Sequence, residues 1–358
     1  MVSMAGISSV PKNVNFSKEY IKSHSEFEVV NPIVHELGNI LVALSKIGRI
    51  DSNMIDMTTV YHRDVLDYFK EFETHPIIDT INTQITEKLD EMSYWHYYAW
   101  KMNAIAYHID SSGNIKNDSI IIKTGFNYPE DPFVRYEDLI NDFVQKSNYI
   151  AFYQAHIPYY SSLIQTYERL NPINKMNQWL ADLFETNYDS YKVVFSPLVY
   201  GAHSTTRFED NGFSQTIMHI CPSYVDNSVS ITLDEMKNSR ILFTEIDHNY
   251  VNPVSDGYID DISIRFSNMD SWADSSKTFG YSNSYKVFNE YMTWSLFSLY
   301  CIDNYEIGEV EKMLLIMEDQ MVNDRGFIKF REFNRKLIKS YEETKDIYSL
   351  YQTALSNE

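Results

Sequence analysis

The chain has 358 residues, and its 30 Lys and Arg residues against 50 Asp and Glu residues give a net charge of −20 at pH 7. A chain this negative repels phosphate backbones and anionic membrane surfaces, so nucleic acid and membranes are not expected as its main partners. Hydrophobic residues make up 44% of the sequence, which is enough for a folded core, and no apolar run reaches the length of a membrane span.

The cysteines and the start of the chain limit the class of protein further. Cys221 and Cys301 are too few for a disulfide framework or a cysteine-rich zinc site, and both are expected to be inert core thiols. Residues 1–16 contain no basic segment followed by an apolar one, so no signal peptide is visible. The localisation is therefore left open between a cytoplasmic protein and an exported one whose signal has been removed.

The first half of the chain is expected to be helical. Apolar residues recur at intervals of three and four over the segments 33–47, 52–72, 79–109, 136–145, 149–170 and 173–186. Asn31 and Pro32 are typical of the start of the first helix, and Gly48 of its end.

The pattern changes near residue 190. The segment 191–200 is apolar, rich in β-branched residues and closed by Pro197 and Gly201, which predicts a buried strand. Within 205–220, Asn211-Gly212 separates two extended arms, which is typical of a hairpin.

The last part of the chain again favours helices. Thr232 and Glu235 match a capping box, which predicts a helix that runs to about residue 250 and is stopped by Asn252-Pro253. A polar loop is expected over 254–284. Helices are then predicted over 285–301 and from residue 306 to the C-terminus.

Together these elements predict an α+β fold that is rich in helix and has a small central mixed sheet. No repeat or linker divides the chain, so a single domain over 21–358 is expected after an N-terminal extension, 1–20. Within it the segments are the helical part 28–186, the sheet and motif helix 190–305, and the C-terminal helices 306–358.

The segment around Glu245 carries the most informative motif. Glu245 and His248 lie three residues apart on a predicted helix, and Thr244 lies four residues before His248, so all three can share one face. Zinc peptidases have a His at the first and the last of these three positions, and the two His hold the metal. The Glu at the middle position deprotonates a water molecule. Here the segment reads T-E-x-x-H, and Thr is not a normal zinc ligand.

Glu290 is the only charged residue in the apolar segment 287–301. A buried carboxylate needs a cation, a metal ion or strong donors. It follows His248 by 42 residues, which suits a further zinc ligand on a second helix, close to His248 in space. The alternative is an ion pair with a buried arginine such as Arg265, or a contact with a helix end.

Three other histidines bear on this site. His35-Glu36 begins like the same motif, but Asn39 stands where a second His would be, so both residues are expected to cap the helix or face solvent. We therefore reject this segment as a metal site. His203 lies just before the predicted hairpin and His219 lies within it. Either histidine can therefore approach the Glu245 helix and supply the zinc ligand that is missing at Thr244.

Several stretches resemble a bacterial family of unknown function whose members are predicted to be zincin-like metallopeptidases. Members typically carry His-Glu-Phe-x-His followed by an aromatic residue and Val-Asn-Pro. Residues 244–248 and 250–253 fall in register with that signature. The resemblance covers about residues 28–305 and includes 30–37, 193–198 and the helix that holds Glu290.

The resemblance implies a zincin-like fold in which His248 is the second zinc ligand, Glu290 the third and Glu245 the general base. The departure is Thr244, at the position of the first ligand. The implied substrate or ligand is a peptide or protein, and the hairpin 205–220 offers an edge strand that could pair with it. In an active site, Tyr250 or Tyr258 would stabilise the oxyanion.

Three hypotheses about function follow. An active zinc peptidase would take its missing ligand from Asp247, His203, His219 or Glu245 itself. A pseudopeptidase would keep the fold and its groove and bind peptides without hydrolysing them. A helical scaffold or interaction protein would carry the motif by chance, so whether the chain is an enzyme stays open at this point.

Overall fold

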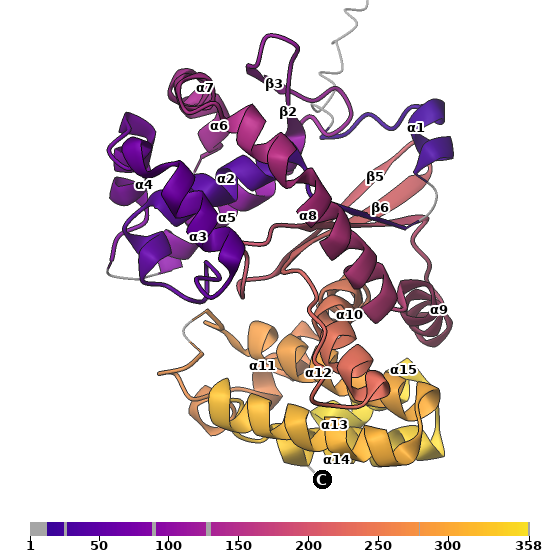
Figure 1. Cartoon of the computed structure of the whole chain (residues 1–358). Helices are drawn as coiled ribbons and strands as arrows, with labels where there is room; N and C mark the ends of the chain where they lie inside the picture. Colours follow the sequence, from indigo (N-terminus) through magenta and orange to yellow (C-terminus); the bar gives the residue numbers. More distant parts are fainter. Residues whose placement is uncertain (1–12, 25–26, 88–90, 127–129, 279, 357–358) are drawn as a thin grey trace, which may run out of the picture.

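The computed structural model describes residues 13–24, 27–87, 91–126, 130–278 and 280–356, which form a helix-rich α+β fold (Figure 1). The predicted fold class is confirmed. In Figure 1 most of the N-terminal helices lie at the upper left, and the C-terminal helices, in orange and yellow, lie below the sheet. No helix among these residues is long and apolar enough to cross a membrane.

Four of the described strands form one mixed sheet in the order β1-β4-β6-β5. They are β1 Glu28–Val30, β4 Ser190–Phe195, β5 Ser204–Asp210 and β6 Phe213–Ile220. β1, β4 and β6 are parallel, whereas β5 pairs antiparallel with β6 and forms one edge of the sheet. Asn211 and Gly212 both have positive φ, as this tight hairpin turn requires. The predicted strand and hairpin are confirmed, and β1 adds a strand that was not predicted.

The N-terminal helices largely follow the predicted apolar periodicity. They are α1 Lys18–Ser23, α2 Ile33–Leu44, α3 Val60–Tyr68, α4 Pro76–Gln84, α5 Glu91–Asn103, α6 Pro132–Arg135, α7 Glu137–Lys146, α8 Tyr149–Leu170 and α9 Ile173–Phe184. The bounds of α8 match the prediction. The continuous helix predicted over 79–109 was wrong, because α4, α5 and the short strand β2 Tyr107–Ile109 share that segment and β2 pairs with β3 Ile115–Asn117.

The C-terminal part is also helical. Its helices are α10 Ile231–Asp256, α11 Ile259–Arg265, α12 Ser284–Asn304, α13 Ile307–Asp319, α14 Phe330–Glu343 and α15 Ile347–Leu355, with a π-helical turn at Gln320–Asp324. Short 3₁₀ turns occur at Ile47–Arg49, Lys70–Phe72, Ala104–Ala106 and Met269–Ser271. The loop predicted over 254–284 was partly wrong, because α11 lies within it and buries Ile262 completely.

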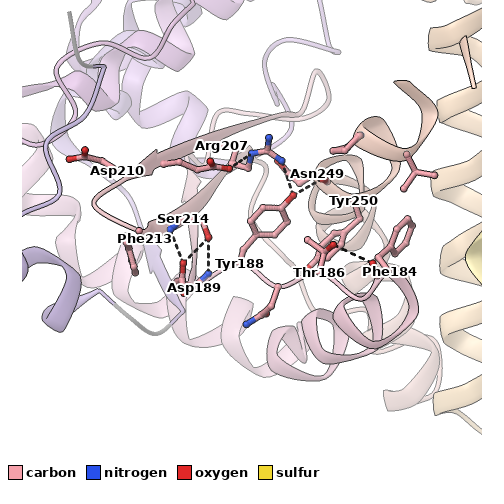
Figure 2. A pocket seen from close by; sticks show the side chains of 15 residues that line it. Phe184, Thr186, Tyr188, Asp189, Arg207, Asp210, Phe213, Ser214, Asn249 and Tyr250 are labelled. Atoms are coloured by element: carbon pink, nitrogen blue, oxygen red, sulfur yellow. Dashed lines mark hydrogen bonds and ion pairs between the residues drawn. The ribbon is translucent and has the colours of Figure 1, made fainter. Parts of the chain in front are cut away.

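Both predicted ends of α10 were wrong. The helix begins after Ser230, whose Oγ accepts a hydrogen bond from Leu233 N at 3.2 Å, and not at Thr232. It continues through Pro253 to Asp256. Pro253 has no N–H to donate to the carbonyl of Asn249, and the Tyr188 hydroxyl donates to that carbonyl instead at 2.6 Å (Figure 2). This replacement from outside the helix allows the proline to remain inside it.

The core positions α10 between the sheet and the C-terminal helices. One large apolar cluster joins β4 and β6 to α10, α12 and α14, and a second fills the N-terminal helices. α10 contacts β5 and β6 on one side and α12 on another, as predicted for the helix that carries Glu245. In the segment predicted as an extension, Phe16 and Tyr20 are buried, and residues 1–12 lie outside the described part.

His35 and Glu36 do not face solvent, contrary to expectation. Both are completely buried, because the helix α2 is enclosed by the rest of the fold from its second residue, Val34, to its last, Leu44. Glu36 accepts hydrogen bonds from Asn31 Nδ2 at 2.7 Å and from Tyr61 Oη at 2.8 Å. Burial raises the pKa of Glu36 to about 7 and lowers that of His35 to about 3.

The contact between Tyr188 and Asn249 generates a stability prediction. Tyr188→Phe is expected to lower the free energy of unfolding by about 1–3 kcal/mol, because the buried carbonyl of Asn249 loses its donor. In a Pro253→Ala background, Tyr188→Phe should lower the free energy of unfolding by clearly less, since the alanine N–H can donate to that carbonyl. Urea unfolding of the four proteins measures the difference, and an equal cost in both backgrounds would contradict this explanation.

Candidate functional site

A cavity of about 1180 Å³ lies where α10 and α12 meet the edge of the sheet. Its walls come from α5, from the loop between β4 and β5, from α10 and α12, and from the chain around the π-helical turn. These segments are far apart in sequence and are brought together by the packing of α10 against β5 and α12. The predicted site residues Glu245, His248 and Glu290 all line this cavity.

The structure brings His248 and Glu290 together. The imidazole Nε2 of His248 lies 4.0 Å from Oε2 of Glu290, although 42 residues separate them in sequence. The side chain of Glu290 is 9% exposed and that of His248 is 24% exposed. The predicted proximity is therefore confirmed, while a role in binding metal stays a prediction.

Glu245 also lines the cavity, on the same helix as His248. Burial and the nearby negative charge of Glu290 raise its pKa, and the charges of His248 and Lys101 oppose that rise. A carboxylate with a raised pKa in a cavity is suited to accept or donate a proton. This position agrees with a general base, which is the role that the resemblance implies for Glu245.

Thr244 lies on the cavity wall and is nearly buried, one helical turn before His248. Its hydroxyl donates a hydrogen bond to the carbonyl of Ile241 at 3.1 Å. The hydroxyl is thus bonded to the backbone of its own helix. Unlike a histidine, Thr244 has no nitrogen that could bind a metal ion beside His248 and Glu290.

Of the substitute ligands considered, only His203 and Glu245 line the cavity. Burial lowers the pKa of His203 to about 3, helped by Lys101 and Arg240, and its Nε2 lies 3.1 Å from the carbonyl oxygen of Tyr200. His219 is completely buried in β6, where its ring lies 5.6 Å from that of His35. His219 is therefore not positioned as a ligand in the cavity.

Asp247 is completely buried outside the cavity wall. Neither of its carboxylate oxygens has a hydrogen-bond partner within the described part of the chain. Burial, together with the charges of Glu245 and Glu290, raises its pKa well above the ordinary value. Because Asp247 is buried outside the cavity wall, it is not positioned to replace the missing ligand.

Glu290 forms the ion pair with a buried arginine that was considered as the alternative to metal binding, but the arginine is Arg325 and not the example Arg265. Arg325 Nη1 lies 2.5 Å from Oε1 of Glu290, and the indole N–H of Trp294 donates to the same oxygen at 2.9 Å. Burial alone would raise the pKa of Glu290, but the charge of Arg325 outweighs it and lowers the pKa. Arg265 lies elsewhere, with its guanidinium 4.7 Å from the Trp272 ring.

These contacts decide how well the cavity fits a zinc ion. A zinc site with an open position needs three protein ligands, and here the donors side by side are the His248 imidazole and a carboxylate already bonded to a guanidinium. A cation beside that carboxylate also repels a metal ion. No group of three or more potential ligands occurs among the described residues. In this arrangement the donor set does not fit zinc.

Several cavity residues were missed by the sequence reasoning. Arg240 precedes Thr244 by four residues, so the helical spacing that placed His248 could have found it. Arg325, which lines the cavity, and Lys101, which is buried and interacts electrostatically with Glu245, gave no such signal, because only tertiary packing brings them to the site. Lys101 is completely enclosed, donates to the carbonyl of Ala202, and has its pKa lowered to about 7 by burial.

The tyrosines proposed for an oxyanion lie elsewhere. Tyr250 is buried beside Tyr191, with its hydroxyl 2.8 Å from Asn177 Oδ1, and Tyr258 packs on Tyr351. Neither lines the cavity. Tyr98 and Tyr281 do, and the Tyr281 hydroxyl accepts a hydrogen bond from Arg325.

A second hollow, of about 600 Å³, lies beside the β5–β6 turn and the end of α10 (Figure 2). Its charged groups bind one another or the backbone. Arg207 donates to the Tyr188 hydroxyl at 2.8 Å and pairs with Glu209, and Asp189 accepts from both N and Oγ of Ser214. Tyr250 lines this hollow, whereas Glu245, His248 and Glu290 do not.

Comparison with protein-family models, with curated proteins and with solved structures finds no match for this chain.

The ion pair between Glu290 and Arg325 predicts a large effect on stability. Arg325→Met is expected to lower the free energy of unfolding by about 3 kcal/mol at pH 7, because a carboxylate is left buried without its cation. Arg325 lowers the pKa of Glu290, so this stabilisation is present above the ordinary pKa of a glutamate and is lost as the pH falls below it. Urea unfolding at pH 7 and in acid measures both effects.

Arg331→Met is the matched control for this experiment. Arg331 pairs with the buried Glu318 at 3.0 Å, but Arg335 contacts the same carboxylate at 3.1 Å and remains after the substitution. We expect a loss below about 1 kcal/mol. Equal losses in the two variants would show that Arg325 is not the main cation for Glu290.

Proposed function

We propose that this chain is a peptide-binding protein with a zincin-like arrangement of its site, in which zinc-dependent hydrolysis has been lost. The contact between Arg325 and Glu290 carries the proposal. It supplies a positive charge to the carboxylate that a zinc peptidase would offer to its metal. Thr244, whose hydroxyl is bonded to its own helix, supports the same interpretation.

The edge of the sheet supports a peptide as the ligand. β5 is an edge strand, and Ser204 and Thr205 at its start line the cavity. An extended peptide can add to such an edge through main-chain hydrogen bonds while its side chains occupy the adjoining space. The cavity is large enough for several residues, and its aromatic lining, which includes Trp95 and Tyr98, suits side-chain contacts.

A second candidate function is zinc-dependent peptide hydrolysis. The 4.0 Å separation of His248 and Glu290, with Glu245 on the same wall, favours it. It requires that Arg325 leave Glu290 and that another residue complete the ligand set. His203 is the candidate, because it is a histidine that lines the cavity. Both candidates take peptides, so an experiment must measure binding and cleavage separately.

The test uses an N-acetylated random heptapeptide pool and the full-length protein. Peptides that co-elute with the protein are identified by mass spectrometry, and the pool is searched for cleavage products with added zinc and with a chelator. We expect retained peptides and no cleavage under either condition. Cleavage that the chelator and Glu245→Gln both abolish would establish the peptidase instead, and the absence of both binding and cleavage would contradict both candidates.

Two tryptophan substitutions test which of the two hollows binds the peptide. Ser204→Trp places an indole in the cavity, whereas Ser214→Trp, on the other strand of the same hairpin, places one in the smaller hollow. Circular dichroism checks that both are folded. Loss of peptide binding in the first variant only is the expected result.

A further inference from the structure

Arg240 is a cation of the cavity wall that has no anionic partner among the described residues. It lies on α10, one turn before Thr244 on the face that carries His248, and its guanidinium lies 4.2 Å from the centre of the Trp294 ring. No hydrogen bond or ion pair joins this guanidinium to any described residue. Arg325, on the same indole at 4.8 Å, differs because it is bonded to Glu290 and Tyr281.

The groups around Arg240 are mainly positive or neutral. Burial and the charge of Arg325 lower the pKa of Arg240 to about 10, so Arg240 stays protonated at pH 7. Cys221 and Glu290 act on Arg240 in the opposite direction, but burial raises the pKa of the Cys221 thiol to about 12, so this thiol is uncharged. The carboxylate of Glu290 is already held by Arg325. An anion from outside would therefore relieve the repulsion between the two guanidinium groups.

The chemistry of a guanidinium narrows the class of anion. Its planar fork of N–H groups matches a carboxylate with two parallel hydrogen bonds. A carboxylate belongs to the main chain only at the C-terminus of a peptide. The β5 edge likewise recognises main-chain groups, so both contacts would act on peptides of many sequences.

We propose that Arg240 binds the C-terminal carboxylate of a peptide lying in the cavity, so that the preferred ligands are peptides with a free C-terminus. This inference rests on the proposed peptide-binding function and names its ligand class. Trp294 holds the guanidinium in place from one side. The other cationic side chains of the wall, Lys277 and Lys286, already donate to carbonyl oxygens of Asn323 and Gly280.

The experiment compares two N-acetylated random heptapeptide pools that differ only at the C-terminus, a free acid and an amide. Binding of each pool to the wild-type protein is measured by equilibrium affinity selection with mass spectrometry. We expect the free-acid pool to bind at least about tenfold more tightly. Arg240→Gln should remove that preference, because it weakens binding of the free-acid pool far more than binding of the amide pool.

Two further variants control the measurement. Arg240→Lys keeps the charge but loses the fork, so part of the preference should remain, and this variant serves if Arg240→Gln does not fold. Arg265→Gln also removes a guanidinium that lies over a tryptophan, but it lies outside the cavity and should leave the preference unchanged.

The possible failures are distinguishable. Equal binding of acid and amide pools by the wild-type protein would overturn the role of Arg240 and leave peptide binding intact. Binding of neither pool would overturn the proposed function itself. A preference that survives in Arg240→Gln, or an enrichment of Asp and Glu peptides in the amide pool that this variant loses, would overturn the C-terminal assignment.

Discussion

Glu290 is held in the apolar part of α12 because Arg325 and Trp294 both contact its Oε1. The rest of the site depends on that pairing. It joins α12 to the end of the π-helical turn, lowers the pKa of the carboxylate, and places a guanidinium within the wall of the cavity. A carboxylate held in this way is a weak candidate for a metal ligand, even with the imidazole of His248 4.0 Å away.

Two arginines in one cavity have different roles for a simple electrostatic reason. Arg325 neutralises a charge of the protein itself, and Arg240, which lies against the same tryptophan, has no such charge to neutralise. The cavity therefore contains the ion pair of Arg325 and Glu290, and in addition the cation Arg240, whose counter-ion comes from outside the described residues. In the proposed function a peptide supplies this counter-ion, with the sheet edge at β5 as the second contact.

The features that depend on local patterns could be predicted from the sequence, and those that depend on distant packing could not. The change of period near residue 190 and the Asn211-Gly212 turn were sufficient to predict the sheet, and the isolated charge of Glu290 indicated a buried partner. The identity of that partner was wrong, because nothing local distinguishes Arg325 from Arg265. The helix stop at Pro253 was wrong because Tyr188, from a different segment, bonds the carbonyl that the proline leaves free.

Calorimetric titration with zinc tests most directly whether Arg325 and Thr244 together keep a metal from the site. We predict that neither the wild-type protein nor Thr244→His binds zinc tightly, because Glu290 stays bonded to Arg325 in both. Thr244→His combined with Arg325→Met frees the carboxylate and adds the missing imidazole, and it should bind about one equivalent, at least about a hundredfold more tightly. Tight binding of one equivalent by the wild-type protein would contradict the account.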